Sequence, residues 1–309
     1  MTTSPGSAAP RPNDPLWPRA SEWLAAAPGE GRADLALLGV PAHGTSLSPT
    51  RADTTPAAAR AALARFSTYA WSRGVDVAEA VRAVDVGDVN DPDADEPATM
   101  AAAQDALRRA RLLLLLGGDN SVTYAGMRGA VGADLARAGL VTFDAHHDLR
   151  DGVSNGSPVR RLVEAGLDGR RIAQVGIADF ANSREYAGRA RELGIHVVPV
   201  GELERRPVRE VFAEAMDVAG GGGGRVYVDL DVDVCDRAVA PACPASVPGG
   251  ISAAQLREAA FLAGADPRVV AVDLTEVDAQ ADSADGRTVR LVALCMLQVA
   301  AGLAVRGGR

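Results

Sequence analysis

Acidic, amide and imidazole side chains follow apolar runs at three points of the sequence. The three stretches are GGDNS (117–121), DAHHD (144–148) and DVD (231–233). Residues two positions apart in an extended chain project to the same side. Asp144, His146 and Asp148 can therefore converge, and so can Asp231 and Asp233. The spacing favours one site in which carboxylates gather around an imidazole.

Carboxylates crowded into one crevice repel one another, and their pKa values rise unless cations lie among them. Divalent metal ions resolve this conflict, and carboxylate-rich ligation with a single imidazole suits Mn²⁺ better than it suits structural zinc. Shared carboxylates indicate a two-metal site, in which a bridging water is acidified to hydroxide and attacks a substrate carbon. Each cluster alone is also explained by helix capping and loop anchoring, whereas the clusters together favour the metal site.

The elements expected to position these residues alternate between strands and helices, which is typical of a parallel α/β sheet. Short apolar runs predict strands at 35–40, 112–116, 140–143, 172–177, 196–200, 226–230 and 269–272. Stretches at helical spacing predict helices at 57–65, 97–111, 121–137, 158–165, 183–193, 208–218, 253–263 and 287–304. In an open parallel sheet the ligand site lies beyond the carboxyl ends of the strands, where the three polar stretches fall.

The domain organisation is expected to be simple. Residues 1–32 are rich in Pro, Ala and Gly and predict an irregular lead-in with one short helix, in which Trp17 and Trp23 are the large anchors. Residues 33–309 show no linker, composition break or repeat. They predict a single α/β domain, which a chain of this length can stabilise with a substantial core.

Charge and residue usage exclude several classes of protein. The 32 basic residues against 40 acidic ones give a net charge of -8 without a dense basic stripe, so nucleic-acid binding is not expected. All 32 are arginines, which excludes enzymes that need a Schiff-base lysine and nucleotide hydrolases that need a P-loop lysine. No export signal is apparent at the N-terminus, and apolar runs such as 112–116 are too short for a membrane span. Three widely spaced cysteines favour a reducing cytoplasm.

Further stretches complete a recognisable set. DLDVDVCD (229–236), APACP (240–244) and TEVD (275–278) follow GVPAHGTSLSP (39–49), GGDNS and DAHHD in chain order. This set resembles the ureohydrolases of the arginase/agmatinase superfamily. The resemblance implies a three-layer α/β/α sandwich around a central, mostly parallel sheet. It also implies two Mn²⁺ ions per subunit and hydrolysis of a C–N bond in a guanidino or formimino group.

The resemblance assigns metal-binding roles position by position. Asp144 and Asp231 correspond to the carboxylates that bridge the two ions. His146 and Asp233 complete the ligands of one ion, and Asp148 binds the other. The remaining ligand is expected to come from the GGDNS stretch.

Two departures from the common family pattern narrow the subfamily. Most members have His where this chain has Asn120, and an amide oxygen is a weaker ligand than imidazole, so the metal site at Asn120 is expected to be weak. Arginases carry a proton-shuttling His after the DAHxD run, where this chain has Asn155. The stretches DAHHDLRDGVSNGSPVRRL, QVGIADFANSREY and DVDVCDRAVAPACPASVPGG resemble the formimidoylglutamase branch, in which Asn also occurs in GGDNS.

The substrate of that branch has two carboxylates and one cationic formimino group. Guanidinium groups suit carboxylates, so Arg150 and Arg184 are expected to bind them, and Glu276 to hold the cationic group. Asn155 and Ser157 are expected to bind the amino-acid end, or else to shape a turn. Solvated surface positions are the alternative for both arginines.

These assignments predict a cytoplasmic hydrolase that cleaves N-formimidoyl-L-glutamate to L-glutamate and formamide in histidine degradation. A metal-bound hydroxide attacks the formimino carbon, with Glu276 and Asp148 as catalytic residues and Asp148 as the proton carrier. An agmatinase or guanidino-acid hydrolase is the alternative within the class, and a diamine product would need carboxylates in place of Arg150 and Arg184. A second alternative is a catalytically silent protein that has lost a metal at Asn120. The resemblance implies a small-molecule substrate and a homo-oligomer.

Overall fold

The computed structural model describes residues 14–25 and 31–306 of the chain. The strands are β1 Ala33–Val40, β2 Tyr69–Ala70, β3 Val75–Asp76, β4 Ala83–Asp88, β5 Ala110–Gly117, β6 Gly139–Phe143, β7 Ile172–Ile177, β8 His196–Pro199, β9 Val226–Asp231 and β10 Val269–Thr275. The α-helices are α1 Ala20–Ala25, α2 Thr55–Ala62, α3 Val77–Ala80, α4 Glu96–Arg109, α5 Ser121–Val131, α6 Pro158–Glu164, α7 Arg184–Glu192, α8 Val208–Ala219, α9 Ala253–Ala265 and α10 Arg287–Arg306.

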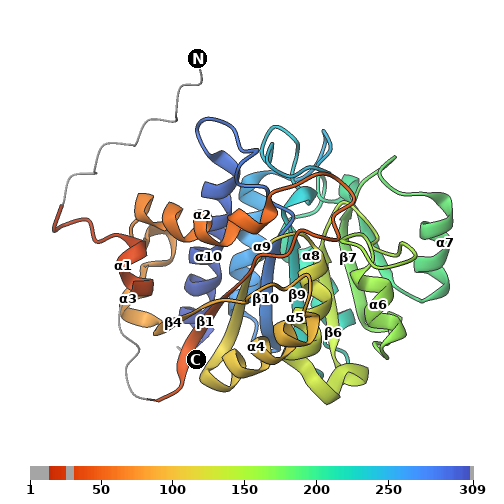
Figure 1. Ribbon diagram of the computed structural model, residues 1–309, viewed down its shortest axis with the longest axis horizontal. Coiled ribbons are helices and arrows are strands. Elements are labelled where there is room, and N and C mark those ends of the chain that lie inside the picture. Colours follow the sequence, from red (N-terminus) through yellow and green to blue (C-terminus); the bar gives the residue numbers. More distant parts are fainter. Residues whose placement is uncertain (1–13, 26–30, 307–309) are drawn as a thin grey trace.

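A parallel sheet forms the centre of the molecule. It has eight strands in the order β4-β1-β5-β10-β9-β6-β7-β8, and each pair of neighbours runs parallel. Helices cover both faces of this sheet (Figure 1). The predicted three-layer α/β/α sandwich around a mostly parallel sheet is therefore confirmed.

The two faces of the sheet belong to two separate hydrophobic clusters. On β5, Leu112, Leu114 and Leu116 pack into the cluster that contains the buried side chains of α2, α8, α9 and α10. Leu113 and Leu115 pack into the cluster that contains those of α4, α5 and α6. All five leucines are buried, because a central parallel strand is covered on both faces. This explains why β5 reads as an unbroken apolar run in the sequence.

The edge strand β4 is absent from the sequence prediction. Its first residue, Ala83, is buried, whereas Asp85 is partly exposed and Asp88 is exposed. Both aspartates form ion pairs with Arg60 on α2, each at 2.6 Å. A strand at the edge is covered less completely than a central one, so β4 lacks the apolar run from which the other seven strands of this sheet were predicted.

The predicted lead-in is only partly described, because residues 1–13 and 26–30 lie outside the described residues. The short helix α1 falls within it. Trp23 on this helix is buried, and its indole Nε1 donates a 2.9 Å hydrogen bond to the carbonyl oxygen of Val81. Trp17 is half exposed, so Trp23 is the anchor that packs into the core.

One helix in the described part of the chain, α10, is long and apolar enough to span a bilayer by length and composition alone, with a mean hydropathy of 1.9 over its apolar window. Within the fold, 67% of that window is buried. The helix packs closely against α9: a Cβ atom added at Gly302 would lie 2.1 Å from the carbonyl oxygen of Phe261. Its apolar composition thus matches its place as a core helix.

Candidate metal and substrate site

The carboxyl ends of four neighbouring strands bring most of the predicted site residues together. β5, β10, β9 and β6 are consecutive in the sheet. Asn120 lies in the turn after β5, and Glu276 directly follows β10. Asp231 ends β9, and Asp144 directly follows β6. Ligand sites in open parallel sheets lie at this edge, because the loops there converge on one crevice.

The turn between β5 and α5 is fixed by close contacts. A Cβ atom at Gly118 would lie 1.9 Å from the carbonyl oxygen of Ala42, so the backbones can approach only because this residue is glycine. The buried carboxylate of Asp119 accepts hydrogen bonds from the hydroxyls of Ser46, at 2.6 Å, and of Ser121. Asp119 therefore fastens the turn that presents the next residue to the cavity.

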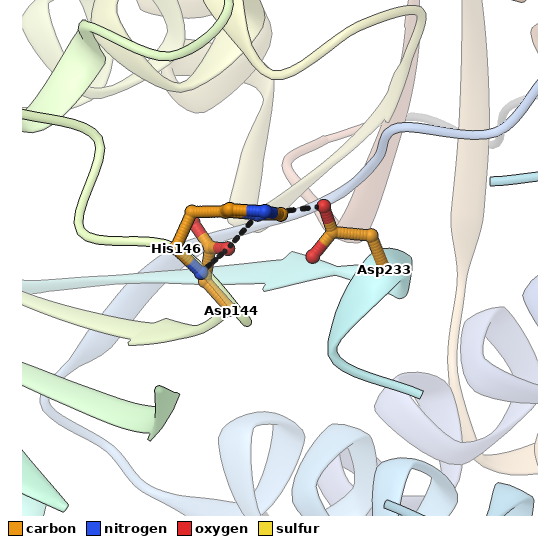
Figure 2. Close-up of side chains that lie close together, drawn as sticks. All are labelled: Asp144, His146 and Asp233. Carbon is orange, nitrogen blue, oxygen red and sulfur yellow. Dashed lines mark hydrogen bonds and ion pairs between the residues drawn. The ribbon is translucent and has the colours of Figure 1, made fainter. Parts of the chain in front are cut away.

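Asp144, His146 and Asp233 form a compact cluster, in which the imidazole ring faces both carboxylates (Figure 2). Nδ1 of His146 lies 3.0 Å from Oδ2 of Asp233 and 3.5 Å from Oδ1 of Asp144. One potential ligand atom from each residue lies within 4.8 Å of the other two. Two carboxylates and one imidazole at this spacing can hold a divalent ion.

The charges in this cluster favour the binding of a cation. Burial disfavours the charged form of His146, but Asp233 and Asp144 raise its pKa to about 12. Burial and the negative charge of Asp233 raise the pKa of Asp144 to about 6. Oδ2 of Asp144 is buried and has no hydrogen-bond partner among the described residues. A bound metal ion would satisfy this orphaned oxygen, so the donor set fits a metal.

Asp148 and Asp231 extend the acidic cluster. Burial raises the pKa of both well above the usual carboxylate range, and the charge of Asp144 adds to the effect at each of them. The backbone of Asp148 has a φ of 53°, a conformation that is rare outside glycine and is often held at functional sites. The structure thus gathers the four carboxylates in one water-poor region.

The amide of Asn120 lies beside Asp148. Its Nδ2 donates a 2.6 Å hydrogen bond to Oδ2 of Asp148. Its Oδ1 accepts hydrogen bonds from the hydroxyls of Thr123, at 2.7 Å, and Thr275, at 3.0 Å. The nitrogen, not the oxygen that a metal ion would need, therefore faces the acidic cluster. The predicted ligand role of Asn120 requires the amide to turn over.

Glu276 is held by two donors on the other side of the site. Its Oε1 accepts hydrogen bonds from the backbone nitrogen of Asn120, at 2.8 Å, and from Nδ2 of Asn155, at 2.7 Å. Burial and the nearby charge of Asp119 raise the pKa of Glu276 to about 8, although both hydrogen bonds oppose this rise. Asn155, predicted to bind substrate, thus also fixes the carboxylate expected to hold the cationic group.

A cavity of about 300 Å³ opens onto these residues. Its lining includes Asp148, Asp231, Asp233 and Glu276 together with one guanidinium group, that of Arg150. No carboxylate among the described residues forms an ion pair with this arginine. The cavity therefore joins an acidic region to a cation that is free to bind an anion.

Two predicted substrate-binding residues lie outside the cavity lining. Ser157 is fully buried, and its hydroxyl closes a turn by donating to the carbonyl oxygen of Ser154 at 2.8 Å and accepting from its nitrogen at 3.0 Å. This matches the turn-shaping alternative. Arg184 is exposed at the start of α7, and the cavity is lined instead by its neighbour Ser183.

Other residues line the cavity without having been predicted. Among them are Tyr186, whose ring lies 6.0 Å from the guanidinium carbon of Arg150, and Asn182. The Asn182 side chain donates to the carbonyl oxygen of Ala145 at 2.9 Å and accepts from the nitrogen of His147 at 2.9 Å. Both residues follow β7, which lies beside β6 in the sheet. The QVGIADFANSREY stretch and its place after a strand were the signals that could have found them.

Comparisons with known proteins agree with this geometry. The profile of the family described as "Arginase family" matches residues 33–302. The chain is 33% identical over 259 residues to a formimidoylglutamase from Halalkalibacterium halodurans, which covers 80% of each chain. It is 34% identical over 238 residues to a guanidinopropionase from Pseudomonas aeruginosa, covering 69% of this chain and 72% of the relative. The crystal structure of formimidoylglutamase from Bacillus subtilis superposes with a TM-score of 0.89 at 28% identity, covering 98% and 97% of the two chains.

Proposed function

The chain belongs to the arginase family, and from this we propose that it is a metal-dependent hydrolase that cleaves N-formimidoyl-L-glutamate to L-glutamate and formamide. The relatives described above include enzymes named for this reaction. One observation carries the choice of substrate. The cavity has acidic groups around the strand ends and a guanidinium, Arg150, that has no carboxylate partner among the described residues.

The proposed cofactor is a pair of Mn²⁺ ions. Asp144, His146 and Asp233 would supply donors for one ion. By the family resemblance, Asp144 and Asp231 would be the carboxylates shared with the other ion. Asp148 supplies a donor for the second. Bound Mn²⁺ supplies Lewis-acid activation of water at neutral pH. The orphaned oxygen of Asp144 and the raised pKa values of Asp148 and Asp231 support this proposal. A bound cation would give that oxygen a partner and would offset the repulsion between the carboxylates.

The protein's own side chains orient the substrate. Arg150 binds a glutamate carboxylate, since a guanidinium and a carboxylate can form two parallel hydrogen bonds. The ring of Tyr186 lies beside this guanidinium, with its centroid 6.0 Å from the guanidinium carbon. Glu276, fixed by Asn155, holds the cationic formimino group at the other end. Asp148 is the proposed proton carrier to the departing nitrogen.

The reaction breaks the bond between the formimino carbon and the glutamate nitrogen. The oxygen of water becomes bonded to that carbon, which leaves as formamide. Because the formimino group is cationic, both water protons end on the glutamate nitrogen, which leaves as the ammonium group of L-glutamate.

A guanidino-acid hydrolase is the second candidate, and two observations favour it. The similarity to guanidinopropionase covers much of the chain. Arg150 also suits a substrate with a single carboxylate. Agmatine is disfavoured, because it carries an amine where Arg150 offers a positive charge.

The test is a substrate panel run with Mn²⁺ and after chelation. Formamide is measured with formiminoglutamate, and urea is measured with 3-guanidinopropionate, 4-guanidinobutyrate, agmatine and arginine. Metal-dependent turnover of formiminoglutamate above all others supports the proposal. Preference for a guanidino acid selects the second candidate. Absence of turnover with every compound would establish the silent alternative.

We also propose a homo-oligomer in a reducing cytoplasm. The family resemblance supports the homo-oligomer.

The reducing cytoplasm is supported by the cysteines. Cys235, Cys243 and Cys295 are free and buried. Burial raises the pKa of the Cys235 and Cys243 thiols well above the usual range, so packing is their proposed role. Light scattering coupled to size exclusion would contradict the oligomer if the mass were 31.8 kDa at every concentration.

A further inference from the structure

A chain of buried hydroxyl and carboxyl groups lies behind Asn120. Tyr227 on β9 donates a 2.7 Å hydrogen bond to Oδ2 of Asp273 on β10. Thr123 on α5 lies 2.8 Å from the same carboxylate oxygen and 2.7 Å from Oδ1 of Asn120. Thr123, Tyr227 and Asp273 are fully buried, and none of them lines the cavity.

A glycine on α5 makes room for this series of hydrogen-bonded side chains. A Cβ atom at Gly126 on α5 would lie 2.5 Å from the hydroxyl oxygen of Tyr227, so glycine is needed for the hydroxyl to reach Asp273. The backbone nitrogen of Leu230 donates to the other oxygen of Asp273 at 3.3 Å. Asp273 is thereby placed as an acceptor between Thr123 and Tyr227.

When Asp273 is ionised, hydrogen counting sets the direction of this series of hydrogen bonds. A threonine hydroxyl has a single hydrogen, and Thr123 has two oxygen atoms within reach, one on Asp273 and one on Asn120. When the hydrogen goes to the carboxylate of Asp273, the Thr123 oxygen can only accept from Asn120. The group of Asn120 that faces it must then be the NH₂. The two ends of a side-chain amide have nearly the same shape, so the hydrogen-bond network determines which end points where.

The turned amide satisfies both threonine hydroxyls beside it. Its two hydrogens reach Thr123 and Thr275, and Thr275 can direct its own hydrogen to Oδ1 of Asp229 at 3.5 Å. The carbonyl oxygen of Asn120 then faces Oδ2 of Asp148, the atom now 2.6 Å from Nδ2. Two oxygens this close need a cation between or beside them.

We propose that Thr123, held by Asp273, is a positioning residue that presents the carbonyl oxygen of Asn120 to the metal ion bound by Asp148. This inference rests on the proposed function, because it presumes a metal in the site. It explains how an amide can serve where the family resemblance leads one to expect imidazole: the buried hydrogen bonds fix its orientation. Groups that orient metal ligands in this way typically change metal affinity by about 10- to 100-fold when removed.

The test measures Mn²⁺ binding rather than turnover. Free Mn²⁺ is followed by electron paramagnetic resonance during titration of chelator-treated wild type, Thr123→Val, Thr123→Ser and Thr99→Val. Thr99→Val is the matched control, because the buried Thr99 hydroxyl has no hydrogen-bond partner within residues 14–25 and 31–306 and lies on α4, away from the cavity. Thr123→Ala examines the same hydroxyl should Thr123→Val not fold.

We expect two ions per chain for the wild type. Thr123→Val should bind one of them about 10- to 100-fold more weakly, while Thr123→Ser and Thr99→Val keep wild-type binding. Equal binding by Thr123→Val and wild type would overturn the inference, and so would equal weakening of both ions together with a lower melting temperature of the metal-free protein. A wild type that binds no Mn²⁺ would overturn the proposed function itself, which is a distinguishable failure.

Discussion

Asn155 and Glu276, 121 positions apart in the sequence, are joined by a 2.7 Å hydrogen bond from the side-chain amide to the carboxylate. The same amide accepts from the backbone nitrogen of Leu47 at 3.0 Å. The loop after β6 is thus tied both to the end of β10 and to the loop after β1. The position that carries a proton-shuttling His in arginases here holds a carboxylate in place.

Asn155→Ala should lower kcat/KM about 10- to 100-fold. A hydrogen bond to a charged group contributes about 1.5–3 kcal/mol, and about 1.4 kcal/mol corresponds to a tenfold change in rate. Steady-state kinetics with formiminoglutamate check this. Asn90→Ala, at an exposed residue outside the cavity lining, is the control and should retain wild-type kinetics. Unchanged kinetics in Asn155→Ala would remove the role assigned to this contact.

Arg150→Gln should raise KM for formiminoglutamate about 10- to 100-fold, because a charge-assisted contact to the substrate carboxylate is lost. Arg184→Gln is the matched control, since Arg184 is exposed and does not line the cavity. Its KM should match that of the wild type. The reverse result, with Arg184→Gln impaired and Arg150→Gln normal, would restore Arg184 as the carboxylate-binding residue.

The metal-free protein should lose stability as pH rises from 5 to 8. The pKa of Glu276 is raised from 4.5 to about 8 and that of Asp144 from 3.8 to about 6, so the folded state holds protons that the unfolded state has released. A raised pKa gives stability that is present at low pH and is lost as pH rises through the folded value. His146, raised from 6.5 to about 12, acts in the same direction above pH 6.5. Urea unfolding in chelator at pH 5, 6, 7 and 8 measures the loss, which is expected to be on the order of several kcal/mol, with Glu276 as the largest contributor.

Two controls belong to that experiment. Saturating Mn²⁺ should make the free energy of unfolding less dependent on pH, because bound cations favour the ionised carboxylates. Glu276→Gln should also reduce the slope, because the substituted side chain does not titrate. A metal-free wild type that becomes more stable between pH 5 and 8 would contradict the pKa directions derived from the acidic cluster.

Gly118→Ala should destabilise the fold by more than about 3 kcal/mol or prevent folding. The new Cβ atom would lie 1.9 Å from a backbone oxygen, that of Ala42, which cannot move aside as a flexible side chain could. Gly188→Ala is the comparison, because the residue is inside α7 and, apart from the backbone of that helix, no described residue has an atom within 4 Å of the added Cβ. It should stabilise the protein by up to about 1 kcal/mol. Thermal melting of both variants provides the check.

The sequence predicts the central strands and the acidic cluster well, for a shared reason. Central parallel strands are covered on both faces and therefore appear as apolar runs. The strand predicted at 172–177 coincides with β7, and Asp144 and Asp231 were found because they come at the ends of such runs. β4 was missed because an edge strand of mixed polarity has no such signal.

The remaining site residues depend on contacts that one sequence does not encode locally. Thr123, Asp273 and Tyr227 come from three elements, and nothing in their spacing indicates that they meet behind Asn120. Arg150 and Arg184 looked equivalent in a chain whose basic residues are all arginine. Both side chains are exposed, and only the packing of α7 against the loop after β6 makes Arg150, and not Arg184, part of the cavity lining.

The central claim is that the strand-end carboxylates hold two manganese ions beside a glutamate-binding cavity. Its most direct test is anomalous diffraction at the manganese edge from crystals soaked with Mn²⁺ and L-glutamate. The account predicts two anomalous peaks, one beside His146 and Asp233 and the other beside Asp148 and Asn120, with a glutamate carboxylate on Arg150. An absence of peaks at these residues, or glutamate bound away from Arg150, would contradict it.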